Sequence, residues 1–221
     1  MRCFGKTKQS TKQMGSAVWT VSLDGKDAQA LANLLPLLGC GEEAAAVAFH
    51  RLANQDTFAQ ATQTALRVIG DEEHVHDSWL SDLACALPAA ENASEIRLEA
   101  KRFHMSLTTG GPMLHLARIA AIDGAVCTML SRLTAPRARL SADAGVAQLL
   151  RHIRNDEARH VAVARGIALL APDRASLREA GAMARSALAM LIAPGAEAFD
   201  QLGVDPDRLI RDVAQLPNGL L

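Results

Sequence analysis

The strongest constraint on the fold of this chain is a short pattern of acids and histidine that occurs twice. Residues 72–76 read Glu-Glu-His-Val-His, and residues 156–160 read Asp-Glu-Ala-Arg-His. Each copy holds a Glu followed three positions later by a His, and positions i and i+3 share one face of a helix. Such a pair directs a carboxylate oxygen and an imidazole nitrogen toward one point. Two pairs, with one carboxylate from each of two further helices, predict a dinuclear metal site inside a helical bundle.

The composition favours an all-α protein. Apolar residues make up 49% of the chain, aromatic residues only 3%, and Tyr is absent, a balance typical of helices rather than strands. Helical spacing dominates from Asp27 onward, so we expect an N-terminal tail over residues 1–26 and a single helical domain over residues 27–221. A brief alternation of apolar residues over positions 18–23 predicts one short extended piece before that domain.

Proline, glycine and capping residues divide the domain into successive helices. The first is expected to end near Asn54, with Pro36 either inside it or at its true start. The next helices are expected over residues 56–87 and 92–109, from 112 to before Pro136, from 141 or 143 to 170, over 173–192, and in a short piece from Pro206.

Three candidate ligands lie in the middle of apolar helical stripes. At offsets −7, −4, +7 and +10 from Glu73, Asp123 and Glu157, every residue is apolar, so these carboxylates are expected to be buried. A buried carboxylate without a partner costs several kcal/mol or changes its pKa until it is neutral. A metal cluster removes that cost where several carboxylates meet.

The first helix offers two neighbouring candidates, Glu42 and Glu43. The four offsets from Glu42 are all apolar, whereas those from Glu43 include a proline, a glycine and a histidine. We therefore predict Glu42 as the ligand, with Glu43 at the edge of the site or in solvent. The complete predicted ligand set is Glu42, Glu73, His76, Asp123, Glu157 and His160.

Over residues 27–170, this pattern resembles the ferritin-like superfamily of dinuclear carboxylate proteins. The resemblance implies a ferritin-like four-helix bundle, here with additional C-terminal helices. It divides the six ligands between two metals, mainly one set from each half of the chain, with one carboxylate from each half as a bridge. The sets are Glu42, Glu73 and His76, and Asp123, Glu157 and His160.

The resemblance extends to the acids that precede each pair. Glu72 and Asp156 match the acids of oxygen-activating members that accept a hydrogen bond from a ligating histidine and fix its tautomer. Residues 156–160 also look like the DExRH motif of bacterial di-iron monooxygenases. Two departures are clear. Asp123 stands where most members carry Glu, and Ile153 stands where arylamine N-oxygenases carry a third histidine.

The function implied by the resemblance is that of a non-haem di-iron oxidase or oxygenase, which activates O₂ for the oxidation of a small organic substrate. The expected cofactor is two Fe ions; Mn/Fe and Mn/Mn pairs share these ligands. The alternative is a ferroxidase or iron-handling protein, disfavoured because no acidic run would guide iron. A structural bundle with a degenerate site is a third reading. The missing Tyr excludes a tyrosyl-radical role.

Charge and cysteine content limit the expected partners. The net charge of −1 gives no global attraction to nucleic acid. No apolar stretch is expected to reach the length of a membrane span. The four cysteines form no close pair, which favours a cytoplasmic, reducing compartment. We expect a monomer or homodimer that meets O₂, a substrate and an electron donor, because the helices after Leu170 can cover faces that a storage cage would use.

Several other side chains allow two interpretations. His115 lies near the Asp123 stripe and is expected to be a satisfied core histidine or to line a channel. Cys127 follows Asp123 by one turn and is expected to be a small core residue. Arg51, Arg132 and Arg159 are expected in ion pairs at the surface or around the site, with binding of a carboxylate substrate as the alternative. The remaining histidines, expected to be exposed, are His50, His74, His104 and His152.

Overall fold

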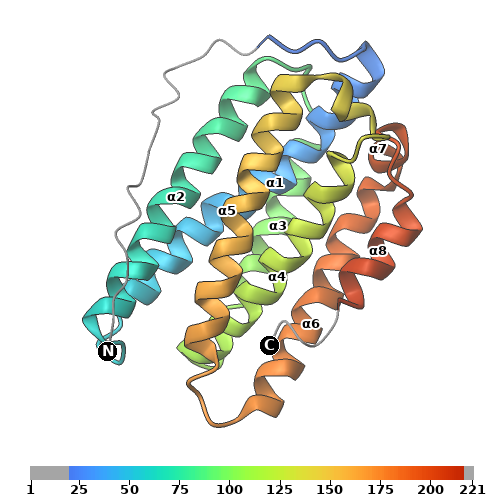
Figure 1. The fold of residues 1–221 in the computed structure, drawn as a ribbon. Coiled ribbons are helices and arrows are strands. Elements are labelled where there is room, and N and C mark those ends of the chain that lie inside the picture. Colours follow the sequence, from blue (N-terminus) through green and yellow to red (C-terminus); the bar gives the residue numbers. More distant parts are fainter. Residues whose placement is uncertain (1–19, 217–221) are drawn as a thin grey trace.

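The computed structural model describes residues 20–216, and the regular secondary structure of this part of the chain is entirely helical, without strands (Figure 1). Its four longest helices are α1 (Gly25–Ala53), α2 (Gln60–Cys85), α4 (Pro112–Leu133) and α5 (Ala144–Ala168). Helix α3 (Ala93–Ser106) connects α2 to α4. The C-terminal helices are α6 (Arg174–Ile192), α7 (Ala196–Gln201) and α8 (Pro206–Ala214), and short 3₁₀ turns are η1 (Arg139–Ala142) and η2 (Ala193–Gly195).

The all-α expectation is confirmed, with differences at helix ends. Helix α1 begins at Gly25, two residues before the predicted domain boundary, because the Asp24 carboxylate caps its first turn. Pro36 lies inside α1, so the alternative start at Pro36 was wrong. Residues 20–24 form no strand, and positions 18 and 19 of the predicted extended piece lie outside the described residues. Helix α7 was not predicted from the sequence.

The long helices pack as two antiparallel pairs. The most extensive contacts join α1 to α2 and α4 to α5, and α2 also contacts α5 between the pairs. Helix α3 lies against α1, while α6 packs on α4 and carries α8 (Figure 1). Four long helices therefore surround one centre. Helices α6 and α8 cover the outer face of α4, and α7 lies against α1.

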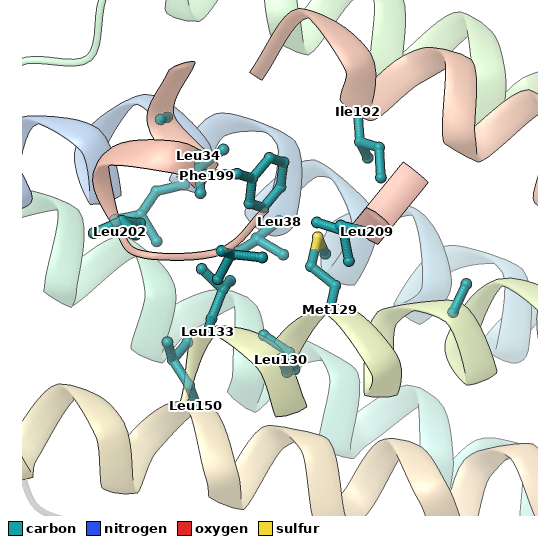
Figure 2. Close-up of a cluster of buried hydrophobic side chains, with 14 of the residues drawn as sticks. Leu34, Leu38, Met129, Leu130, Leu133, Leu150, Ile192, Phe199, Leu202 and Leu209 are labelled. Carbon is teal, nitrogen blue, oxygen red and sulfur yellow. The ribbon is translucent and has the colours of Figure 1, made fainter. Parts of the chain in front are cut away.

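Two apolar clusters fill the bundle, one toward each end. The first, shown in part in Figure 2, combines side chains from the long helices with the C-terminal helices, among them Leu38, Leu130, Phe199 and Leu209. The second is built around Phe49, with side chains from the opposite ends of the same long helices. Each fully buried Leu or Phe side chain contributes roughly 1.5–3 kcal/mol to folding, so these clusters hold the bundle together.

The apolar stripes predicted around the ligand carboxylates contribute to both clusters. On each of the four long helices, two of the four flanking residues lie in the first cluster and two in the second. The carboxylates in the middle of the stripes therefore lie at one level, between the clusters. Along the chain, α1 and α5 run from the first cluster through this level to the second, and α2 and α4 run in the opposite direction.

Two of the core helices resemble membrane spans by length and composition. Helices α1 and α4 both meet that criterion, although 61% of the relevant window in each is buried inside the bundle. The expectation that no apolar stretch reaches this length was therefore wrong. Because core helices of soluble proteins meet the same criterion, this observation is weak support for either environment.

Asp143 fastens the N-terminal segment to the bundle. One carboxylate oxygen caps α5 by accepting from the Val146 N–H at 3.0 Å. The other accepts from the backbone N–H and the hydroxyl of Ser22, at 2.6 and 3.0 Å. Burial opposes ionisation, but these hydrogen bonds outweigh it and hold the pKa of Asp143 below its usual range.

We expect Asp143→Ala to lower the free energy of unfolding by roughly 1–3 kcal/mol at pH 7. Because the pKa of Asp143 is lowered, its contribution is complete above the unfolded-state pKa and is lost as the pH falls through the folded-state value. Urea denaturation at pH 7 and in acid measures both effects. Asp173→Ala is the matched control, because Asp173 caps α6 through Ser176 alone and should lower stability less. Equal losses would contradict the fastening role.

Candidate metal centre

The level between the two apolar clusters is filled by acids and histidines. Each of the four long helices contributes to it, and all six predicted ligands are less than one-tenth exposed. The structure therefore brings together the complete predicted set: Glu42 from α1, Glu73 and His76 from α2, Asp123 from α4, and Glu157 and His160 from α5.

One half of this cluster has the geometry of a metal site. Glu42, Glu73, His76 and Glu157 each offer an atom, and these atoms lie within 4.8 Å of one another. The Nδ1 atom of His76 lies 3.2 Å from Glu42, 3.5 Å from Glu73 and 3.5 Å from Glu157. This group could hold a metal ion. Glu43, by contrast, is exposed.

The other half is built around His160 and Asp123. The Nδ1 atom of His160 lies 2.8 Å from Oε1 of Glu73 and 3.6 Å from Oε2 of Glu157. The opposite oxygens of the same two carboxylates face His76. Glu73 and Glu157 therefore each span the gap between the imidazoles, whose ring centres are 5.9 Å apart. Asp123 approaches this half from α4, near enough for its charge to act with those of Glu157, Glu73 and His160.

Several polar atoms of the cluster are buried without a hydrogen-bond partner. They are Glu73 Oε1, Asp123 Oδ2, Glu157 Oε1 and His160 Nδ1. His160 Nδ1 is close to Glu73 Oε1, but the alignment is not that of a hydrogen bond. An unsatisfied buried polar atom costs about 1–3 kcal/mol, and a cation bound among these atoms would remove that cost. Two divalent cations would match the four inner carboxylates in charge, leaving both imidazoles neutral.

Glu72 and Asp156, here called the outer acids, orient the two histidines. Each outer acid contacts the histidine of the opposite motif. Nε2 of His76 on α2 faces Oδ2 of Asp156 on α5 at 3.3 Å, and Nε2 of His160 on α5 faces Oε2 of Glu72 on α2 at 3.0 Å. When each Nε2–H donates to its acid, the Nδ1 lone pair is directed at the cluster, as metal ligation requires. The acids predicted to fix the tautomers therefore contact the histidines of the opposite motif.

A single guanidinium joins the two outer acids. Arg159 donates to Glu72 and to Asp156, both at 2.7 Å. These bonds, together with those to the histidines, lower the pKa values of both acids although burial opposes it. The first motif has Val75 where the second has Arg159, so one arginine serves both halves. The i,i+3 spacing of Asp156 and Arg159 indicates one of these contacts, but the contact with Glu72 depends on the packing of α2 against α5.

In the absence of metal, protonation of the cluster's own side chains compensates the negative charge of its carboxylates. Burial lowers the pKa of His160, but its close contacts with Glu157, Glu72 and Glu73 outweigh burial and raise that pKa to about 11. Contacts with Asp156, Glu157, Glu42 and Glu73 likewise raise the pKa of His76. Burial and the charge of Glu157 raise the pKa values of Glu42 and Asp123 well above normal. The protein alone therefore disfavours four free carboxylates at this level.

A pocket of about 370 Å³ reaches the cluster from the side of α1, α3 and α4. Its lining is largely aliphatic, and the four inner carboxylates Glu42, Glu73, Asp123 and Glu157 form part of its wall. Its volume is in the range of small-molecule sites. Neither His76 nor His160 lines the pocket.

The secondary candidates have mixed outcomes. His115 is buried and lines the pocket, and His104 lines it as a half-buried residue. The expected exposure is correct for His74 and His152 but wrong for His104 and His50, which are half-buried. Cys127 is half-buried, and burial with the charges of Glu157 and Asp123 raises its pKa to about 12. This thiol therefore stays protonated at neutral pH.

Comparison with known proteins yields no matching family model and no significant match among curated proteins. The chemistry of the cluster must therefore be derived from its own ligands and surroundings. What these establish directly is a buried group of carboxylates and histidine with the geometry to hold a metal ion.

We expect Glu42→Ala to reduce the metal retained after anaerobic loading with Fe(II) and desalting, because Glu42 belongs to the group with metal-site geometry. Glu43→Ala is the matched control on the same helix. It should retain metal like the parent, because Glu43 is exposed. Elemental analysis gives the ratio of metal to protein. Loss of metal in Glu43→Ala, with retention in Glu42→Ala, would contradict the assignment.

We expect Asp123→Asn to raise the stability of the metal-free protein, by on the order of 1 kcal/mol. The reason is that burial and the negative charge of Glu157 disfavour ionised Asp123, and Asn keeps the shape without the charge. The same substitution should reduce the increase in melting temperature on metal addition, because a ligand is lost. Thermal unfolding with and without Fe(II) measures both effects. A variant less stable than the parent without metal would show that the carboxylate is not repelled there.

Proposed function

We propose that this protein is a non-haem di-iron carboxylate oxidase or oxygenase, built on a ferritin-like four-helix bundle and acting on a small organic molecule. The observation that carries the proposal is an apolar pocket whose wall includes four inner carboxylates of a buried carboxylate–histidine cluster. A metal-binding group alone is compatible with many roles. An apolar pocket beside it supports oxidation of an organic substrate.

In this proposal α1, α2, α4 and α5 are the four helices of the bundle. Helix α3 is the long connection between its two halves, and α6–α8 are additions to it. The two motif-bearing helices, α2 and α5, contact each other, and each lone carboxylate lies on the helix paired with one of them. This is the arrangement of inward-facing ligands in dinuclear carboxylate bundles.

The chain's own residues would divide the work of holding two ions. Glu42 and His76 would serve one ion, Asp123 and His160 the other, and Glu73 and Glu157 would bridge, because each presents one oxygen toward each histidine. Fe/Fe is the expected pair, with Mn/Fe and Mn/Mn compatible with the same donors. When bound, ferrous ions supply electrons for the reduction of O₂.

The surroundings position the ligands and exclude water. Asp156 and Glu72 hold the Nε2 protons of His76 and His160, and Arg159 keeps both acids ionised and in place. The aliphatic wall of the pocket replaces water beside the carboxylates, which strengthens electrostatic interactions there. Arg159 is 46% exposed in its side chain, so the outer network also reaches solvent, where an electron donor would approach.

The alternative is a ferroxidase or iron-handling protein with the same ligands. Iron would then be the substrate and would need a polar path to the cluster, whereas the pocket is largely aliphatic. We keep the cytoplasm as the expected compartment and a monomer or homodimer as the expected state, without nucleic-acid or membrane partners.

The decisive experiment adds O₂ to the anaerobically Fe(II)-loaded protein. For an oxygenase or oxidase, we expect two ions per chain, O₂ uptake stoichiometric with the bound iron, and a change in the rate when a substrate fills the pocket. Oxygen-electrode and stopped-flow absorbance measurements give these quantities.

Excess Fe(II) provides the contrasting condition. A ferroxidase would continue to consume O₂ and would oxidise many ions per chain, and a store would also elute as a large assembly in size-exclusion chromatography with light scattering. That outcome would replace the oxygenase proposal by the iron-handling one. Failure to retain more than a trace of metal would remove both.

A further inference from the structure

The pocket beside the cluster is a slot between α1 and α3. Among the α1 residues that line it, four have little or no side chain: Gly41, Ala44, Ala45 and Ala48. Small residues there hold the space open, because larger side chains at these positions would fill it. The slot extends along α1 as far as Arg51, with Glu42 nearer its other end.

The mouth of the slot is edged by exposed side chains from both helices. On α1 these are Glu43, Val47 and Arg51, one turn apart from each other, and on α3 they include Lys101 and Met105. Val47 and Met105 are apolar but 64% and 67% exposed. The mouth therefore presents apolar surface to solvent, which favours the capture of an apolar molecule.

Charge is unevenly distributed along the mouth. Lys101 and Glu43 both line the slot, and both act on the Cys40 thiol, whose pKa burial and then Glu43 raise and Lys101 lowers. This stretch of the mouth therefore carries one charge of each sign. At the other end, Arg51 forms no salt bridge with any described residue, and His115, the neighbouring polar residue, offers no negative charge.

His115 and Arg118 reinforce the positive character of that end. Burial, with the positive charges of Arg118 and Arg51, lowers the pKa of His115 to about 4, so the imidazole is neutral at pH 7. Arg118 is held by the backbone carbonyls of Leu107 and Thr109. Two guanidinium groups therefore lie near one end of a largely aliphatic slot, and Arg51 is the one that lines it.

We propose that the α1–α3 slot binds an extended amphipathic molecule with a single anionic group, which pairs with Arg51 while the apolar body lies against the carboxylate cluster. Arg51 and Glu42 are nine positions apart on α1, which corresponds to roughly 13 Å along the helix axis. The reacting part of the molecule is therefore distant from its anionic group. As an assignment of substrate class, this inference rests on the proposed function.

Isothermal titration calorimetry on the metal-free protein tests the binding directly. The probes are decanoate and its uncharged counterpart decan-1-ol. Without metal, the carboxylate of decanoate cannot act as a metal ligand. Any affinity that this carboxylate adds must therefore come from residues of the slot. We expect decanoate to bind about tenfold more tightly than decan-1-ol, because a charge-assisted hydrogen bond is added.

Substitutions identify the residue that provides the extra affinity for decanoate. Arg51→Gln should remove the preference for decanoate and leave decan-1-ol unchanged. Lys101→Gln should preserve the preference, because Lys101 lies on the stretch of the mouth that also carries Glu43. Arg178→Gln, at an exposed position on α6, is a control for net charge. Ala48→Leu should weaken both probes by filling the slot, with its melting temperature checked against the parent.

Three results would overturn the inference: binding of neither probe, equal affinity for both, or a preference for decanoate that survives in Arg51→Gln. The binding assay needs neither metal nor O₂, so its failure is distinct from failure of the proposed function. Decanoate binding through Arg51 in a protein that does not react with O₂ would leave the slot assignment standing and remove the oxygenase proposal.

Discussion

The structure depends on placing four carboxylates at one level inside a bundle that is apolar above and below that level. Burial disfavours charge on Glu42 and Asp123, and the two imidazoles offset only part of the negative charge. Apolar packing of the long helices supplies the free energy that keeps these groups together. Strain of this kind is typical of sites built to receive a cation, because the cation binds only the folded state that gathers its ligands.

The outer network distinguishes a preorganised site from a chance meeting of acids. Glu72 and Asp156 each reach the histidine of the opposite motif, and Arg159 ties the two acids together. Helices α2 and α5 are thereby joined through a chain of hydrogen bonds that runs from His76 through Asp156, Arg159 and Glu72 to His160. The fold itself therefore fixes the orientation of both imidazoles, and for a metal ion bound here the cost of arranging the ligands would fall on folding rather than on binding.

The two faces of the cluster have different surroundings. Histidines, outer acids and Arg159 lie on the side of α2 and α5, whereas the aliphatic slot lies on the side of α1, α3 and α4. One face is therefore polar and connected to solvent, and the other is suited to an apolar molecule. Electrons and protons on one side and an organic substrate on the other would be separated by the cluster itself.

The sequence by itself indicated the approximate course of the long helices and which carboxylates are buried, because helical periodicity places Glu42, Glu73, Asp123 and Glu157 in the middle of apolar stripes. It also distinguished Glu42 from Glu43 by the same argument. It did not indicate α7 or decide the start of α1. Tertiary packing alone decided that the outer acids cross between motifs, that Arg159 bonds both of them, and that α3 leaves a slot beside α1. Those features depend on contacts between helices distant in sequence, and periodicity within one helix carries no information about them.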